Sequence, residues 1–302
     1  MSRLLSLLVL ASCAWAALVP DVRALLNRGD FPAAEKLIND FQKRNGTTPE
    51  MLEAQSWLGR AALAAKQYAR ADSYAAGTRN TIVELLKKRK LDDEERLPIA
   101  LGATIEVQGQ ALAGMGKREA GIAFLKKELA QWHATSMRAR IQKNIHLLSL
   151  EGQPPPPIEM REWLGPKPPT IGSLKGKPVL LFFWAHWCAD CKYQGPILAQ
   201  LRDRYGAKGL QLIAPTQYYG YAAGGEDATP AQEKPYMQRI RQEFYPGLGN
   251  VSAPISVETF QAYGVSTTPT LVLLDKAGMV TMYHPGRMTY EELANEIDKV
   301  MR

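Results

Sequence analysis

The alternation of apolar and polar residues divides the chain into two halves with different periodicities. In the first half, alanine, leucine, lysine and glutamate recur at spacings of three and four residues, which predicts amphipathic helices. After the proline run 154–157, short continuous apolar runs alternate with helical patterns, which predicts a sheet flanked by helices. A proline run interrupts a helix and favours an extended spacer. We therefore expect an all-α domain over 20–150, a proline-rich linker over 151–164 and an α/β domain over 165–302.

The helical half contains a weak internal repeat, in which a turn is followed by a small residue and then by a larger apolar one. The three copies cover 27–38, 64–75 and 114–125. The small residues are Ala34, Ala71 and Ala120. The larger residue near the next turn is Ile38 in the first copy and Phe124 in the third, whereas the middle copy has Ala75 there. The pattern resembles tetratricopeptide repeats, whose helical hairpins stack because one hairpin alone cannot bury its apolar face. A generic helical bundle with alanines at crowded crossings is the alternative. Either way, we expect a scaffold or a surface that binds a protein partner.

The first residues have the pattern of an export signal. Arg3 is a minimal positive region, and the run 4–10 is apolar. Ala14 and Ala16 are small residues at the positions that a signal peptidase reads, so the pattern predicts a signal peptide over 1–16. The stretch 10–13 also resembles a bacterial lipobox, in which Cys13 is lipidated and the leader covers 1–12. A short buried helix with an incidental cysteine is a third interpretation. Both export routes predict a periplasmic protein, soluble or lipid-anchored, with no other contact to the membrane.

Charge gives little support to a nucleic-acid partner. The net charge is +7 over 302 residues, and the densest basic run, 87–90, is followed at once by the acidic run 92–95. No aromatic residues that would stack on bases are interleaved with the basic ones. We therefore expect no nucleic-acid binding.

Outside the leader, the sequence contains only two cysteines, Cys188 and Cys191. They follow the apolar run 178–184, which predicts a buried strand, and precede an amphipathic pattern over 192–205, which predicts a helix. The first turn of a helix presents unpaired N–H groups and the positive end of its dipole, which stabilise a thiolate. We therefore expect Cys188 to be a redox nucleophile and Cys191 to resolve the mixed disulfide.

Two other roles for the cysteines stay open on this evidence. A structural zinc site needs four ligands, usually from two paired clusters, and the sequence has no second such cluster, so we expect no metal. A purely structural disulfide would close a very small loop and would constrain the unfolded chain little.

The stretch 182–192, FFWAHWCADCK, resembles the active-site stretch of the thioredoxin superfamily, and in particular the TlpA/ResA-like exported thiol:disulfide oxidoreductases. The resemblance continues through Pro196, the stretch 263–270 (YGVSTTPT), the strand 271–274, the turn 275–278 and the capping-box pair Thr289 and Glu292, and it covers roughly 165–302. It implies a mixed central sheet flanked by helices and a redox-active Cys188–Cys191 disulfide. It further implies protein thiol and disulfide substrates, an upstream thiol electron donor, and no cofactor.

The same resemblance assigns the substrate-contacting residues. Pro269 corresponds to the cis-proline that faces the cysteines, and a cis peptide bond before proline usually marks a purposeful tight turn. The backbone of Thr268 would pair with an extended substrate chain, and Trp187 would lie beside the bound substrate.

Departures from the family bear on proton transfer. Thioredoxins carry a buried aspartate where this chain has Phe182, and TlpA/ResA-like reductases commonly carry a glutamate where it has Gln194. Gln194 can form hydrogen bonds but cannot titrate, so that Lys192 or a water is left to help. Asp190, between the cysteines, favours the helix N-terminus but disfavours a nearby thiolate. A less stabilised thiolate lowers the reduction potential, and we therefore predict a reductant.

An insertion over 215–234 follows the predicted strand 210–214. This strand should run parallel to the strand before the cysteines. Ligands bind at the carboxyl ends of such strands, so the tyrosine cluster 218–221 is a candidate substrate-contact loop. The alternative is a surface loop whose tyrosines pack on their own domain.

Two other functions are weighed against the oxidoreductase. A thiol peroxidase usually carries proline and threonine upstream of its cysteine, where this chain has Leu181 and Ala185. A redox-silent adaptor with a partner-binding helical half would not require the intact cysteine pair.

Overall fold

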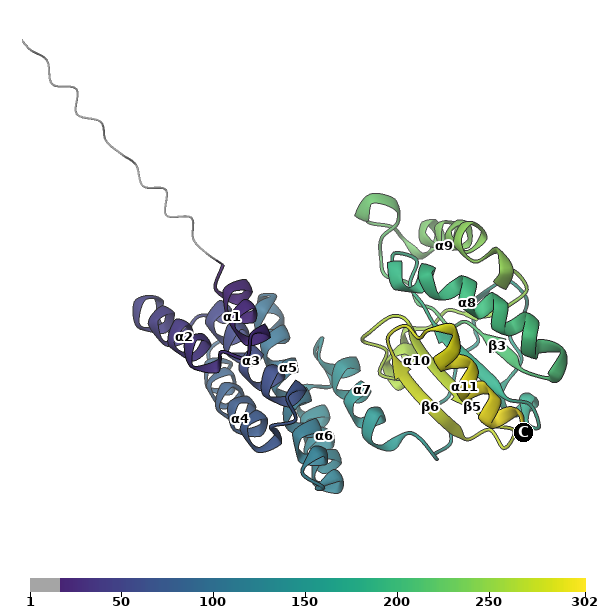
Figure 1. The fold of residues 1–302 in the computed structure, drawn as a ribbon. Helices are drawn as coiled ribbons and strands as arrows, with labels where there is room; N and C mark the ends of the chain where they lie inside the picture. The colour runs from purple at the N-terminus through teal and green to yellow at the C-terminus, as the bar shows by residue number, and fades with distance from the viewer. Residues whose placement is uncertain (1–16) are drawn as a thin grey trace, which may run out of the picture. The chain divides into compact units, whose positions relative to one another are not determined.

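The computed structural model describes residues 17–302, so that the predicted leader and the candidate lipidation site Cys13 lie outside the described residues. The chain forms two compact units, of which the first ends at Val107 and the second begins at Gln108. Figure 1 traces both from purple to yellow. The division falls within a helix, earlier than the boundary expected at the proline run. Within residues 17–302, no helix is both long and apolar enough to cross a membrane.

The first unit is built of helical hairpins, as predicted. Its elements are α1 (Leu18–Asn27), α2 (Phe31–Asn45), α3 (Pro49–Ala64), α4 (Tyr68–Leu85), the short 3₁₀ helix η1 (Leu91–Asp93) and the first part of α5 (Arg96–Gly114). The side chains of Asp30 and Thr48 cap α2 and α3 by accepting backbone N–H groups at 3.1 and 3.2 Å. The repeat residues Ala34 and Ala71 are fully buried, which lets neighbouring helices approach closely.

In the third copy of the repeat, the structure corrects the predicted register by one residue. Ala120 is exposed, and the small buried residue of α6 (Arg118–Trp132) is Gly121. A Cβ atom at Gly121 would lie 2.7 Å from the carbonyl oxygen of Gly109, so no larger residue fits this crossing. The fully buried apolar residue one turn later is Leu125, whereas Phe124 is only partly buried.

The second unit contains a four-stranded mixed sheet in the order β3-β2-β5-β6. Its strands are β2 (Val179–Phe183), β3 (Gln211–Ile213), β5 (Thr270–Leu274) and β6 (Val280–Pro285). Strand β3 pairs parallel to β2, as predicted, whereas β5 pairs antiparallel to β2 and β6 antiparallel to β5. A separate two-stranded sheet joins β1 (Trp163–Leu164) to β4 (Ala253–Pro254).

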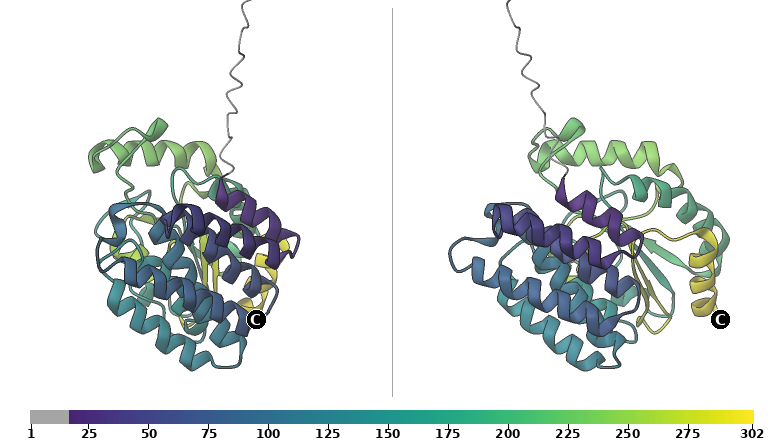
Figure 2. Two further views of the ribbon diagram at one scale, coloured as in Figure 1. Left: turned by 90° about the vertical axis from the view of Figure 1, so that its left-hand side faces the viewer. Right: turned by 60° about the vertical axis from the view of Figure 1, so that its left-hand side comes forward.

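Alternate side chains of β2 enter two different cores, because successive residues of a strand point to opposite faces. Leu180 and Phe182 pack with α8 (Ala189–Tyr205), α9 (Pro230–Phe244) and α11 (Tyr290–Met301). Leu181 and Phe183 pack on the other face, where α10 (Val257–Ala262) contributes Phe260. Figures 1 and 2 show the helices around this sheet from three directions. Short 3₁₀ helices complete the unit: η2 (Ile171–Leu174), η3 (Gly206–Lys208), η4 (Ala223–Gly225) and η5 (Pro246–Leu248).

The stretch that contains the proline run is hydrogen-bonded within the second unit, while Pro154 and Pro157 themselves are exposed. It follows α7 (Arg138–Ser149), and Gly152 and Gln153 exchange backbone hydrogen bonds of 2.8 and 2.9 Å with Val280 of β6. The Tyr263 hydroxyl donates to the carbonyl of Pro156 at 2.8 Å. Proline lacks an N–H group but keeps its carbonyl acceptor, so a proline run can still be fixed in place by donors from its neighbours.

Candidate active site

The two cysteines lie where β2 turns into α8, and they form a disulfide bond with their Cα atoms 5.2 Å apart. Cys188 is the N-cap residue of α8, and its Sγ accepts the backbone N–H of Cys191 at 3.0 Å. Cys188 is 3% exposed and Cys191 is fully buried. The helix therefore directs an N–H donor at the more accessible sulfur, as the sequence predicts.

The loop before β5 faces this sulfur with backbone groups. The Thr268–Pro269 peptide bond is cis, as predicted, and the carbonyl oxygen of Thr268 lies 3.4 Å from the Sγ atom of Cys188. The backbone N–H of Gly286 donates to the carbonyl of Pro269 at 2.7 Å, which ties this loop to the one that follows β6.

Two exposed aromatic side chains flank the buried cysteine pair in the sequence. Trp187, directly before Cys188, is 50% exposed, and Tyr193 is 54% exposed. The Arg287 guanidinium lies 4.7 Å from the centroid of the Tyr193 ring and 3.5 Å from a carboxylate oxygen of Asp190. The cation of Arg287 thus offsets part of the negative charge between the cysteines.

The three residues expected to handle protons have different surroundings. Gln194 is fully buried on α8 and accepts the backbone N–H of Met288 at 2.8 Å, while its Nε2 has no partner among the described residues. The Lys192 ammonium lies 3.9 Å from the centroid of the Phe244 ring, and Asp190 is the partner of Arg287. Phe182 is buried in the core and contacts Tyr245 edge-on.

The sequence prediction missed a buried hydrogen-bonded pair beside this turn. His186 is 1% exposed, Glu233 of α9 is 0% exposed, and the Nε2 of His186 lies 3.1 Å from a carboxylate oxygen of Glu233. Burial lowers the pKa of His186, and the attraction of Glu233 opposes this shift. The helix that carries Glu233 starts inside the insertion, and its capping box of Thr229 and Gln232 is a spacing that could have revealed it.

The tyrosine cluster predicted as a substrate loop packs on its own domain. The rings of Tyr219 and Tyr221 contact His186 edge-on, with centroids 5.4 and 5.2 Å away, and Tyr219 also contacts Trp187 at 5.6 Å. Burial raises the pKa of Tyr219 above its ordinary value. This arrangement agrees with the alternative given for the loop, although the contact with Trp187 keeps it beside the disulfide.

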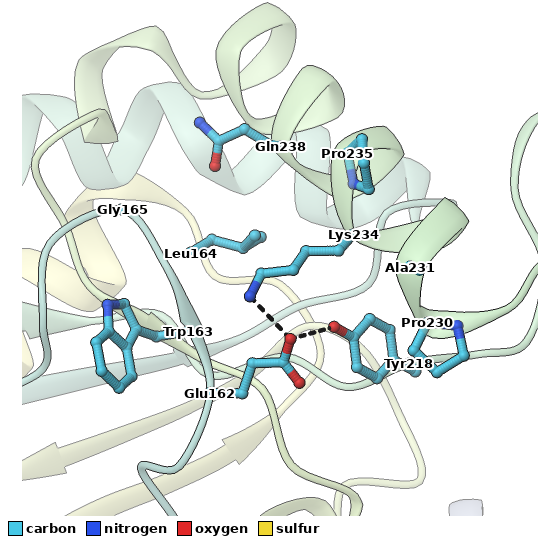
Figure 3. A pocket seen from close by; sticks show the side chains of 10 residues that line it. All are labelled: Glu162, Trp163, Leu164, Gly165, Tyr218, Pro230, Ala231, Lys234, Pro235 and Gln238. Carbon is cyan, nitrogen blue, oxygen red and sulfur yellow. Dashed lines mark hydrogen bonds and ion pairs between the residues drawn. The ribbon is translucent and has the colours of Figure 1, made fainter.

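A hollow of about 560 Å³ is lined by Tyr218, Glu162 and Lys234. Figure 3 shows that Glu162 accepts hydrogen bonds from Tyr218 and Lys234, at 2.7 and 2.8 Å. The hydrogen bond from Lys234 is the main cause of the lowered pKa of Glu162. The other residues that line it are mainly apolar: Trp163, Leu164, Gly165, Pro230, Ala231, Pro235 and Gln238. Neither cysteine lines the hollow, so its polar groups serve to anchor the insertion.

Across residues 17–302, no three histidine, cysteine or carboxylate side chains lie close enough together to hold a metal ion.

Comparison with known proteins finds similarity over the second half of the chain. A family model described as a thioredoxin-like domain matches residues 173–301. The thiol-disulfide oxidoreductase ResA of Bacillus thuringiensis (strain Al Hakam) is 30% identical over 134 residues, which cover 43% of this chain and 67% of that protein. The thioredoxin-like protein YneN of Bacillus subtilis (strain 168) is 28% identical over 151 residues, covering 49% of this chain and 79% of YneN. A thioredoxin-family thiol:disulfide interchange protein from Chlorobium tepidum TLS matches with a TM-score of 0.36 and 19% identity, over 50% of this chain and 97% of that one.

Proposed function

Because the chain belongs to the thioredoxin-like family of thiol-disulfide oxidoreductases that includes ResA, we propose that it reduces disulfides of proteins outside the cytoplasm. The observation that carries this proposal is the Cys188 sulfur at the N-cap of α8, with the N–H of Cys191 on one side and the Thr268 carbonyl on the other.

The first step is attack by the Cys188 thiolate on one sulfur of the substrate disulfide. The substrate S–S bond breaks, a mixed disulfide forms, and one substrate sulfur leaves as a thiolate that takes up a proton. The N–H of Cys191 and the start of α8 are placed to stabilise the anionic form of Cys188, which is the attacking species.

The second step is attack by the Cys191 thiolate on the Cys188 sulfur. This step forms the intramolecular disulfide and releases the second substrate thiolate, so that the substrate gains two electrons and the cysteine pair loses two. An upstream dithiol donor then reduces the pair again. Gln194 cannot take up the Cys191 proton, which would pass to water, but its buried Nε2 has no partner among the described residues and would donate a hydrogen bond to the Cys191 thiolate. Lys192 and Asp190 have other partners.

Substrate binding is assigned to the two sides of the sulfur. The backbone of Thr268, held before the cis-Pro269 bond, would pair with an extended substrate chain, while the half-exposed Trp187 would contact its side chains. The location outside the cytoplasm is supported by the export pattern of residues 1–16, with Cys13 as a possible lipid anchor. The helical hairpins, with their tetratricopeptide-like pattern, would bind a protein partner.

The test is reduction of insulin by the full chain with dithiothreitol as electron donor. Cys188→Ser should abolish turnover, because no thiolate remains for the first step. Cys191→Ser should instead accumulate mixed disulfides with substrate proteins, since only the resolving thiol is missing. Insulin reduction by Cys188→Ser at the wild-type rate would exclude this function. A strongly oxidising reduction potential of the cysteine pair would exclude a role as a reductant.

A further inference from the structure

The buried pair of His186 and Glu233 has no part in the steps above, although His186 lies two residues before Cys188. Both side chains are at most 1% exposed, and they come from parts of the chain 47 residues apart. Burying a carboxylate is costly unless hydrogen bonds replace its water, so such a pair has to be held by surrounding donors.

The donors to Glu233 come mainly from the backbone of the tyrosine loop. One carboxylate oxygen accepts the N–H of Tyr219 at 2.7 Å, and the other accepts the N–H of Gly220 at 2.9 Å. Gly220 has a φ of 81°, a conformation that side-chain-bearing residues rarely adopt. Glu233 is also hydrogen-bonded to His186, the residue before Trp187. This one side chain of α9 therefore fixes both His186 and the tight turn at Gly220.

Aromatic rings continue this connection to the surface beside the sulfur. The rings of Tyr219, Tyr221 and Tyr236 meet the His186 ring edge-on at 5.2 to 5.4 Å. Tyr219 also meets Trp187 edge-on, and Trp187 is the half-exposed residue adjoining Cys188. Aromatic pairs of this kind contribute beyond the area that they bury, so Tyr219 restrains the Trp187 ring from one side.

The charge state of the pair follows from its surroundings. The titratable and charged groups facing His186 are Glu233 and Tyr236 of α9, Tyr219 and Tyr221 of the loop, and Lys192 of α8. The Nδ1 of His186 is buried without a partner among the described residues. A neutral imidazole that donates from Nε2 to Glu233 leaves only an acceptor unpaired, whereas the protonated ring would bury an unpaired N–H.

We propose that Glu233 is a positioning residue for polypeptide substrates: it fixes His186 and the Tyr219–Gly220 turn so that Tyr219 holds Trp187 beside the reacting sulfur. This inference rests on the proposed function as a reductase of protein disulfides. A small disulfide needs access to the Cys188 sulfur alone, whereas a polypeptide also needs the surface around it. Loss of the positioning should therefore slow the reaction with a protein far more than the reaction with a small disulfide.

The experiment compares the full chain with its Glu233→Gln variant, each reduced beforehand and freed of reductant. Second-order rate constants for oxidation by insulin and by glutathione disulfide are measured by acid quenching and thiol alkylation. For Glu233→Gln, we expect the insulin constant to fall about tenfold, the factor for losing one buried hydrogen bond, and the glutathione constant to change by less than about threefold. Glu243→Gln, an exposed carboxylate on the same helix, should match the wild type for both.

Tyr219→Leu tests the inference without disturbing the buried carboxylate, should Glu233→Gln fail to fold. It removes the ring that contacts Trp187 and should show the same selective loss, which Tyr219→Phe should not show because it keeps this ring. Equal losses for both oxidants, or no loss in either variant, would overturn the positioning role while leaving the proposed function standing. A wild-type protein that insulin does not oxidise would overturn the proposed function and this inference with it.

Discussion

The two segments that flank the disulfide are built from different groups. On the cis-proline side, backbone atoms make the contacts, with the Thr268 carbonyl facing Cys188 and the Pro269 carbonyl bound by Gly286. On the insertion side, buried side chains make them, centred on His186 and Glu233. A backbone contact depends on local conformation, whereas a buried polar network depends on the identity of each member. The insertion side should therefore be the more sensitive of the two to single substitutions.

The largest effect is expected at Arg241, a buried residue of α9, the helix that also carries Glu233. Its guanidinium is buried and donates to the carbonyls of Leu248 and Gly249 at 3.1 and 3.2 Å, and to that of Val251. Arg241→Ala leaves these acceptors without a donor and should lower the free energy of unfolding by about 3 kcal/mol or more, measured by urea denaturation. Arg239→Ala, at an exposed position of the same helix, should cost less than about 1 kcal/mol. Similar values for both variants would contradict this account.

A smaller effect is expected at Gln194, a side chain of α8 that contacts the cis-proline side only through the backbone of Met288, in the loop that Gly286 ties to Pro269. Gln194→Met keeps the length of the side chain but removes the acceptor for the buried N–H of Met288, which should cost about 1–2 kcal/mol in the free energy of unfolding. Gln200→Met, exposed on the same helix, is the matched control and should be close to neutral. If Gln194→Met cost as much as Arg241→Ala, the two sides would not differ as we describe.

Acid should affect the insertion side through His186. Burial lowers the pKa of His186 and of His146 below the ordinary value of 6.5. Below that value the unfolded chain binds more protons than the folded one, so stability is fully present above pH 6.5 and is lost as the pH falls through the lowered pKa values. His186→Gln should reduce the slope of the free energy of unfolding against pH, and the part of the slope that comes from His146 should remain. Urea denaturation from pH 7.5 to 5 measures the slope, and an unchanged slope would show that His186 does not titrate in this range.

The smallest effect is expected at Asp190, whose charge is exposed and offset by Arg287. Asp190→Asn removes a negative charge near the thiolate and should raise the reduction potential of the cysteine pair by about 20 mV or less. Equilibration with glutathione buffers measures this shift. A fall in the reduction potential would contradict this account. It would show that the interaction of Asp190 with the helix N-terminus outweighs its repulsion of the Cys188 thiolate.

The parts of the site that could be predicted from the sequence are those encoded by nearby residues. Cys188 and Cys191 lie in a short stretch whose pattern predicts the strand-to-helix turn, and the resemblance of the stretch around Pro269 to the thioredoxin superfamily predicts the cis bond. Three of the four strands of the main sheet, β2, β3 and β5, could be found from their short apolar runs, whereas β6 includes Thr281 and His284 and has no such run.

The missed features depend on contacts between distant residues. Glu233 looks like any carboxylate on an amphipathic helix, and only folding brings it to His186, 47 residues away. The register of the third helical repeat was wrong for a related reason. Alanine and glycine are both small, and only the close approach of Gly109 shows that Gly121 occupies the crossing.

The packing of Gly152 and Gln153 on Val280 has a consequence for the edge of the sheet. Strand β6 is the last strand in the order, and a bare edge presents N–H and carbonyl groups that can pair with another molecule. The two backbone hydrogen bonds to Val280 occupy part of this edge with the protein's own chain. A fragment that began at residue 165 would lack this cover and should self-associate. An isolated redox domain should therefore be cut at the start of the second compact unit, residue 108, so that the protein keeps its own protection against aggregation.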